Sequence, residues 1–247
     1  MSKIESAALQ HRSVRQFADV ALSEEQLRTL EAIAQATATS KFMQQFSLIR
    51  VSDPELKRQI AAVTTYDYVA GPGQLYVFVL DQARNVRLVE SVHGDLHQLT
   101  NWDALLGCVF DATLAAQNMV AAAERSGLGT VYLGSVLNDP RRMIELLHLP
   151  RYTFPLLGLK VGVPADVPAI KPRWPRSAVV GVDKYPHIDA EALRDYDTTI
   201  KKYYAGRATN AKDNTYTQYI QQHLVDSMHH RDDIGAILRA QGFDLPQ

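Results

Sequence analysis

The sequence has little of what marks a secreted, membrane-spanning or nucleic-acid-binding protein. It has one cysteine in 247 residues, which excludes an internal disulfide and a zinc site built from several thiolates. Its 26 basic and 27 acidic residues give a net charge of −1, without the basic excess that non-specific binding to nucleic acid needs. Its longest apolar stretch, residues 105–123, is broken by Asp111, Gln117 and Asn118, and the first residues lack the apolar core of a signal peptide. We therefore expect a soluble cytoplasmic protein that binds neither nucleic acid nor membranes.

Local patterns predict an alternation of helices and strands in the first two thirds of the chain. Short apolar or β-branched runs predict strands at residues 46–51, 75–80, 130–133 and 156–162. A capping box, Ser23 to Gln26, predicts a helix that begins there, and the pairs Asp53-Pro54 and Asp139-Pro140 predict two more helix starts. Residues 103–126 predict a long alanine-rich helix that Gly127 closes. The alternation is typical of an α+β or α/β sandwich.

The composition changes after Pro164. Five prolines between residues 164 and 186 predict a loop-rich crossing, and polar helices are expected near 189–204, 216–228 and 232–241. Residues 206–214 are rich in glycine, asparagine and charge, which predicts a loop. We expect residues 1–247 to form a single domain, with residues 164–247 as an extension packed on it.

Three short segments contain groups that suit an anionic ligand. In residues 11–17 (HRSVRQF), His11, Ser13 and Arg15 face one side of an extended chain, and such donors suit a phosphate. In residues 127–135 (GLGTVYLGS), glycines flank a strand, and the backbone at Gly134 suits close approach of a ring or phosphate. Pro172 holds the two cations of residues 171–173 (KPR) in extended geometry. Taken singly, the three segments are better interpreted as a solvated basic turn, an ordinary helix–strand join and an exposed triplet.

No metal site or catalytic triad is apparent. His93 and His97 are four residues apart, but the glutamate that follows the first histidine of a zinc protease motif is missing. We expect both histidines on an exposed helix face. Cys108 lies in an apolar run and is expected to be a buried structural residue.

Taken in order along the chain, the segments resemble the nitroreductase family of flavoproteins. Within the family, the resemblance is to the oxygen-insensitive NADPH nitroreductase and NADPH-flavin reductase branch. The segments that carry it are residues 11–17, 36–40 with Phe42 and Gln44, 115–118, 127–129, 132–134, 155–159 with Gly162, 164–166 and 171–173, together with Tyr196 and the loop around Arg207. The resemblance covers nearly the whole chain, and the joint order of the segments is more specific than any one of them.

The resemblance implies an α+β fold, a nitroreductase-like sandwich with a central, mostly antiparallel sheet flanked by helices and a helical C-terminal extension. It also implies a homodimer with one FMN in each of two interfacial sites, and places the helix at 103–126 in that interface. The residues implied to contact FMN are His11, Arg12, Ser13, Arg15, Thr39, Gln44, Tyr68, Tyr132, Leu133, Gly134, Ser135, Lys171 and Arg173. Of these, His11, Lys171 and Arg173 would neutralise the phosphate and Arg15 would lie near the pyrimidine edge of the ring. Arg207 is the candidate ligand for the 2′-phosphate of NADPH.

The chain departs from the branch at two positions. Tyr66 stands where the branch usually has a glutamine near the flavin, and Leu137 stands where it can carry an arginine. The second change weakens the expected NADPH site.

The implied activity is an FMN-dependent NAD(P)H oxidoreductase. Hydride would pass in ping-pong fashion from NADPH to FMN and on to a nitroaromatic, a quinone or free flavin, with no side chain needed as acid or base. One alternative is an NADPH:FMN reductase that supplies free reduced flavin. Another, of a different class, is a flavin-binding protein for storage or sensing, and a domain that binds no flavin is the third.

Overall fold

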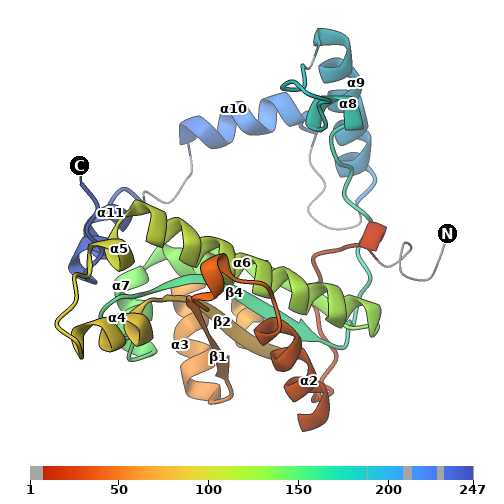
Figure 1. The fold of residues 1–247 in the computed structure, drawn as a ribbon. Coiled ribbons are helices and arrows are strands. Elements are labelled where there is room, and N and C mark those ends of the chain that lie inside the picture. The colour runs from red at the N-terminus through yellow and green to blue at the C-terminus, as the bar shows by residue number, and fades with distance from the viewer. Residues whose placement is uncertain (1–7, 188, 208–212, 227–230, 247) are drawn as a thin grey trace. The chain divides into compact units, whose positions relative to one another are not determined.

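The computed structural model describes residues 8–187, 189–207, 213–226 and 231–246. The chain forms two compact units, one of Met1–Pro168 with Arg231–Gln247 and the other of Ala169–His230. Figure 1 shows the ribbon of both. Each unit is described by itself.

The first unit is built on a four-stranded sheet of β1 (Phe46–Val51), β2 (Gln74–Asp81), β3 (Gly129–Leu133) and β4 (Thr153–Gly162). The strand order is β1-β2-β4-β3 and all neighbours are antiparallel, which confirms the predicted α+β class with an antiparallel sheet. β4 begins at Thr153, three residues before the predicted start, and so includes Pro155. Pro155 lies opposite Val79 at a register shift, where its missing N–H group is tolerated.

One face of the sheet is covered by α2 (Glu24–Gln35), α6 (Trp102–Arg125) and α11 (Ile234–Ala240), and Figure 1 shows α6 running along the sheet. The predicted capping box begins α2. Ser23 Oγ accepts a hydrogen bond from the Gln26 N–H group, and Gln26 Oε1 accepts one from the Ser23 N–H group. The predicted long helix is α6, and Gly127 follows it with φ 79°. Tyr76, Phe78 and Leu159 form part of the core beneath these helices.

The opposite face is covered by α3 (Pro54–Thr64), α7 (Pro140–Leu146) and the 3₁₀ segment η3 (Gly134–Asn138). Both predicted Asp-Pro starts are confirmed, because Asp53 and Asp139 accept hydrogen bonds from the first-turn N–H groups of α3 and α7. Val77, Val79 and Val131 lie in the core on this side. The shorter elements of the unit are η1 (Ser40–Phe42), η2 (Asp67–Val69), α4 (Ala83–Glu90) and α5 (His97–Thr100).

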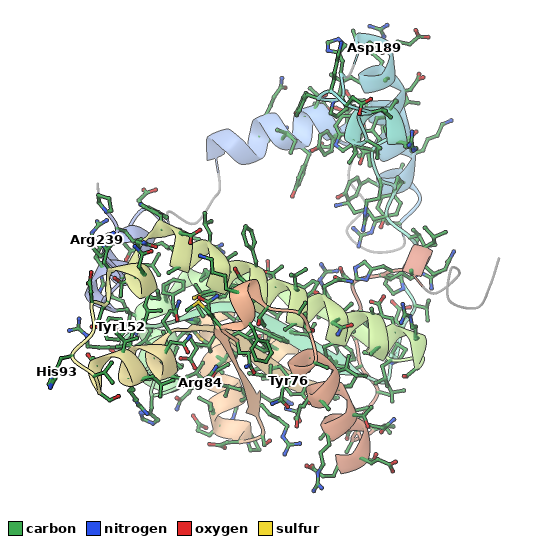
Figure 2. All side chains as sticks on the ribbon, viewed as in Figure 1. Tyr76, Arg84, His93, Tyr152, Asp189 and Arg239 are labelled. Atoms are coloured by element: carbon green, nitrogen blue, oxygen red, sulfur yellow. The ribbon has the colours of Figure 1, made fainter. Side chains whose placement is uncertain are left out.

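The prediction that His93 and His97 share a helix face is wrong. α4 ends at Glu90, and His93 has φ 55° in the turn that closes it, with the Gly94 N–H bonded to the Val89 carbonyl. This left-handed closure ends the helix before His97, which begins α5. Figure 2 shows His93 on the outside of the molecule. Within the described ranges, no group of three His, Cys, Asp or Glu residues could hold a metal ion.

α6 is long and apolar enough to cross a membrane, but 56% of its most apolar window is buried inside the protein. It packs on the sheet through alanines, Cys108 and Met119, as a core helix does. Its other side carries four exposed apolar residues at four-residue spacing, namely Trp102, Leu106, Phe110 and Leu114. We call these four residues the α6 stripe.

The second unit contains α8 (Arg176–Val179), α9 (Ala190–Ala205) and α10 (Tyr216–Asp226). Its core is aromatic, with the Trp174 ring stacked at 4.1 Å on Tyr196 and edge-on at 4.8 Å to Tyr216. Part of the predicted loop, residues 208–212, and the end of the predicted helix at 227–228 lie outside the described residues. The packing of residues 164–247 on the first domain stays a prediction.

Candidate active site

The segment that carries His11, Arg12, Ser13 and Arg15 is extended and lies beside β3. Ser13 forms a parallel bridge with Thr130, and the Val14 N–H donates to the Thr130 carbonyl at 2.8 Å. Val14 is buried, whereas Arg15 is exposed, as the alternation of an extended chain requires. Gly129 allows this approach, because a Cβ atom there would lie 2.8 Å from Val14. The segment is therefore fixed to the sheet by its backbone.

His11 and Tyr132 are both tied to α6. Glu124 Oε1 lies 2.7 Å from His11 Nδ1 and accepts from Thr130 Oγ1 at 2.6 Å. The Tyr132 hydroxyl donates to Gln117 Oε1 at 3.1 Å, and burial, followed by the charge of Glu124, raises the pKa of Tyr132 to about 12. The Glu124 carboxylate thus pairs with His11 and also accepts the Thr130 hydrogen bond.

Two of the predicted FMN ligands have buried polar atoms without a partner in the described structure. They are Arg12 Nε and Ser135 Oγ. Arg12 lines a pocket of about 230 Å³ together with Val14, Glu124 and Pro164. At Gly134, next to Ser135, the direction of a side chain points into open space. Buried donors normally have acceptors, so these atoms fit a ligand rich in oxygen such as the phosphate or ring carbonyls of FMN.

The side chains of Arg15 and Tyr68 interact. Burial raises the pKa of the Tyr68 hydroxyl, and the charge of Arg15 and a hydrogen bond from it partly offset that rise. Tyr66 stacks on Tyr68 with the ring centroids 5.5 Å apart. Arg15 has no carboxylate partner among the described residues, and its other contact is a 3.4 Å hydrogen bond to the Ser13 carbonyl. Its charge is therefore not neutralised by any acidic group among the described residues.

Thr39 and Gln44 lie in a loop whose backbone is strained. Lys41, Phe42 and Gln44 all have positive φ, between 52° and 57°. Thr39 Oγ1 accepts from the Gln44 N–H at 3.3 Å, and Arg84, labelled in Figure 2, donates to the Gln44 and Phe46 carbonyls. Strain of this kind persists only where the surroundings fix the backbone, and it clusters at functional sites.

Asp111 fixes this loop, and sequence reasoning missed it. It is fully buried on α6, and its carboxylate accepts from the Ser40 N–H at 2.7 Å and the Gln45 N–H at 3.0 Å. Gln45 in turn accepts from Gln82 Nε2 at 2.6 Å. A carboxylate inside an alanine-rich helix was the signal in the sequence, although it was seen only as a break in an apolar run.

We expect Asp111→Asn to destabilise the protein by about 1–3 kcal/mol, because the amide leaves one buried N–H without an acceptor. Urea unfolding of the FMN-free protein measures this. Asp103→Asn is the matched control, since Asp103 lies on the same helix in an exposed ion pair with Lys41, and it should change little. Equal effects of the two substitutions would contradict the role given to Asp111.

The predicted ligands Lys171, Arg173 and Arg207 lie in the second unit. Lys171 Nζ and the Arg207 guanidinium lie 5.6 Å and 5.8 Å from the centre of the Tyr204 ring, so both cations border one aromatic ring. Arg173 donates to the Lys171 carbonyl at 2.8 Å, and the Tyr196 hydroxyl donates to the Pro172 carbonyl at 3.4 Å. The aromatic core therefore holds the 171–173 loop.

The remaining predicted residue, Leu133, ends β3 with its side chain 1% exposed. Any contact that it makes with a ligand would use its backbone. In the first unit, the structure thus places Ser13 beside β3, the strand that contains Tyr132. It also brings Arg15 into contact with Tyr68, and Thr39 into contact with Gln44.

Comparisons with known proteins agree along most of the chain. The model of the nitroreductase family matches residues 8–163, and that of the nitroreductase family C-terminal domain matches residues 171–246. An NADPH-dependent oxidoreductase of Staphylococcus haemolyticus is 40% identical over 216 residues, 85% of this chain and 86% of that protein. An FMN reductase (NADPH) of Bacillus subtilis is 38% identical over 221 residues, 86% of this chain and 87% of that protein. The structure of the NfrA1 nitroreductase from B. subtilis has a TM-score of 0.91 and 34% identity, covering 97% of this chain and 98% of that one.

Proposed function

This chain belongs to the nitroreductase family and is an FMN-dependent NAD(P)H oxidoreductase, and we propose that it works as a cytoplasmic homodimer that takes its electrons from NADPH. The acceptors that we propose are nitroaromatics, quinones and free flavin. Free FMN as acceptor is supported by the B. subtilis relative, whose name is FMN reductase (NADPH). The observation that carries the site is the pair of unpartnered buried atoms, Arg12 Nε and Ser135 Oγ.

Each part of the chain has a separate task in this proposal. When bound, FMN supplies the redox chemistry, by taking hydride from the nicotinamide and giving electrons to the acceptor. In the first unit, Arg12 and Ser13 contact FMN and His11 helps to neutralise its phosphate. In the second unit, Lys171 and Arg173 are the cations that the resemblance assigns to the phosphate. Arg15 sets the charge beside the ring, and Tyr68 holds the guanidinium in place. The loop of Thr39 and Gln44, fixed by Asp111, contributes two further FMN contacts.

The homodimer explains the α6 stripe. Its four residues are 48% to 56% exposed, although large apolar side chains that recur on one side of a helix are normally covered. A second copy of the chain would cover them, and each flavin site would then need both copies.

Anaerobic reduction tests the function directly. The purified protein, reconstituted with FMN, is expected to lose its yellow absorbance with NADPH and to regain it with nitrofurazone, a quinone or free FMN. The ratio of kcat/KM for the three acceptors identifies the preferred class. A protein that binds FMN but is not reduced by NADPH or NADH would contradict the proposal.

We expect Arg207→Ala to raise the KM for NADPH by up to about tenfold and the KM for NADH hardly at all. A guanidinium can pair bidentately with the 2′-phosphate that NADH lacks, and such a bond contributes about 1.5–3 kcal/mol when well formed. Leu137, in place of an arginine, keeps the expected effect near the lower end. The change in kcat should be small if ground state and transition state share the contact.

Steady-state kinetics with both donors measures this change. Lys202→Ala is the control, since Lys202 is an exposed cation of the same unit. Equal increases in the KM for NADPH and NADH would remove Arg207 from the phosphate site.

A further inference from the structure

Lys160 is a lysine in an unusual place. It lies in the middle of β4 with a fully buried side chain, and no carboxylate is paired with it in the described residues. Its Nζ donates to three backbone carbonyls, those of Tyr68, Val69 at 3.1 Å and Gly71 at 3.0 Å. Fully buried lysines are rare because desolvation of an ammonium is costly, so this loop provides the compensating acceptors.

A second ammonium serves the same loop farther along. Lys57 of α3 donates to the carbonyls of Gly71 at 3.1 Å and Gly73 at 2.8 Å. The two lysines thus bond four carbonyls of this loop, and of the two lysines only Lys160 bonds the carbonyl of Tyr68, which also accepts from the Gly71 N–H group at 3.3 Å. This difference allows the contribution of Lys160 to be separated from that of loop anchoring in general.

Lys160 also touches the segment that carries Arg15. Its Nζ lies 5.6 Å from the centre of the Phe17 ring, two residues beyond Arg15. On the other side, the Tyr68 carbonyl accepts a hydrogen bond from Lys160, and the Tyr68 hydroxyl accepts one from Arg15. The buried ammonium is therefore in contact with both segments that meet where Arg15 and Tyr68 interact.

We propose that Lys160 is a positioning residue of the flavin site, whose ammonium fixes the backbone of Tyr68 so that the Tyr68 hydroxyl holds Arg15 beside the flavin ring. The inference rests on the proposed placement of Arg15 and Tyr68 at FMN.

We expect Lys160 to lose its charge within the range of pH in which the protein can be studied. The groups that face it are Lys57 from α3, the Phe17 ring and the loop carbonyls, with no acidic group among the described residues. Burial, followed by repulsion from Lys57, lowers the pKa of Lys160 to about 8. Above that pH the neutral amine has two N–H groups for three carbonyls, so the hold on Tyr68 weakens.

The test compares Lys160→Met with Lys57→Met in the full-length, FMN-reconstituted protein. The dissociation constant of oxidised FMN is measured by quenching of flavin fluorescence between pH 6.5 and 9. For the wild type we expect weaker binding above an inflection near pH 8. Lys160→Met should raise the dissociation constant about fivefold at pH 7 and remove the inflection, within the range for coupled neighbours. Lys57→Met should keep the inflection but move it to higher pH, because the repulsion from Lys57 is removed.

A double-mutant cycle with Tyr68→Phe tests the route. If Lys160 acts through the Tyr68 hydroxyl, Lys160→Met should change FMN affinity far less in the Tyr68→Phe background than in the wild type. Additive effects, or a Lys57→Met variant with the same loss of the inflection, would overturn the inference.

The wild-type profile keeps the test decisive even if Lys160→Met fails to fold, because a profile without an inflection near pH 8 also overturns the inference. A wild type that binds FMN and is bleached by NADPH, but shows no inflection, refutes the role of Lys160 alone. A wild type that does not bind FMN refutes the proposed function.

Discussion

Replacing Arg15 by alanine is expected to weaken FMN binding by about ten- to hundredfold, as the loss of a charge-assisted hydrogen bond would. It is also expected to lower the midpoint potential of the bound flavin. A cation beside the ring favours the reduced form, which carries negative charge, and no carboxylate of the described residues neutralises Arg15. Dye-coupled anaerobic titration measures the potential, and equilibrium dialysis the affinity.

Arg15→Lys is the matched variant. It keeps the positive charge but loses the planar fork, so its potential should stay near the wild-type value while its affinity falls. A midpoint potential in Arg15→Ala that rises or does not change would show that Arg15 is not at the ring. An unchanged affinity with a lowered potential would place Arg15 near the ring without contact.

Most of the fold could be predicted because its signals are local. The capping box at Ser23, the Asp-Pro pairs and the apolar strands each act within a few residues, and the structure confirms them. The errors arise where a contact between distant segments, or the closure of a turn, sets the end of a helix or strand. Pro155 enters β4 because a register shift in the partner strand accommodates it, and His93 leaves the helical pattern because Gly94 closes α4.

The candidate site divides in the same way. The residues assigned to FMN could be identified because their segments resemble a family along the chain, and their roles stay predictions. The contacts of Asp111 and Lys160, and the contact of Glu124 with His11, could not be predicted, because these partners lie far away in sequence. Asp111 holds N–H groups 71 and 66 residues distant, and Lys160 holds carbonyls 89 to 92 residues distant. A charge can be buried only where the fold brings hydrogen-bond partners to it, and the spacing of residues along the sequence does not reveal those partners.

A charged α6 stripe is expected to abolish the proposed dimer and with it FMN binding. In the double substitution Phe110→Glu with Leu114→Glu, each interface would have to bury four unpaired carboxylates, two from each copy. Burying one unpaired charge costs several kcal/mol. This cost is larger than the stabilisation that burial of Phe110 or Leu114 gives the dimer, so association becomes unfavourable. The variant should sediment as a monomer at micromolar concentration and retain little FMN after gel filtration, whereas the wild type should sediment as a dimer with one FMN per chain.

The matched control is Leu88→Glu with Val92→Glu, which places the same two charges on exposed apolar positions in and just after α4, outside the stripe. Circular dichroism of both variants establishes that the helices remain, since the substituted side chains are half or more exposed and contribute little to the core. If the dimer forms through the stripe, only the α6 variant dissociates, and its FMN content falls in step with the dimer fraction. Loss of FMN without dissociation would place the stripe at the flavin instead of the interface. A monomer that keeps one FMN per chain would mean that each chain builds its site alone, and the requirement for a second copy would fall.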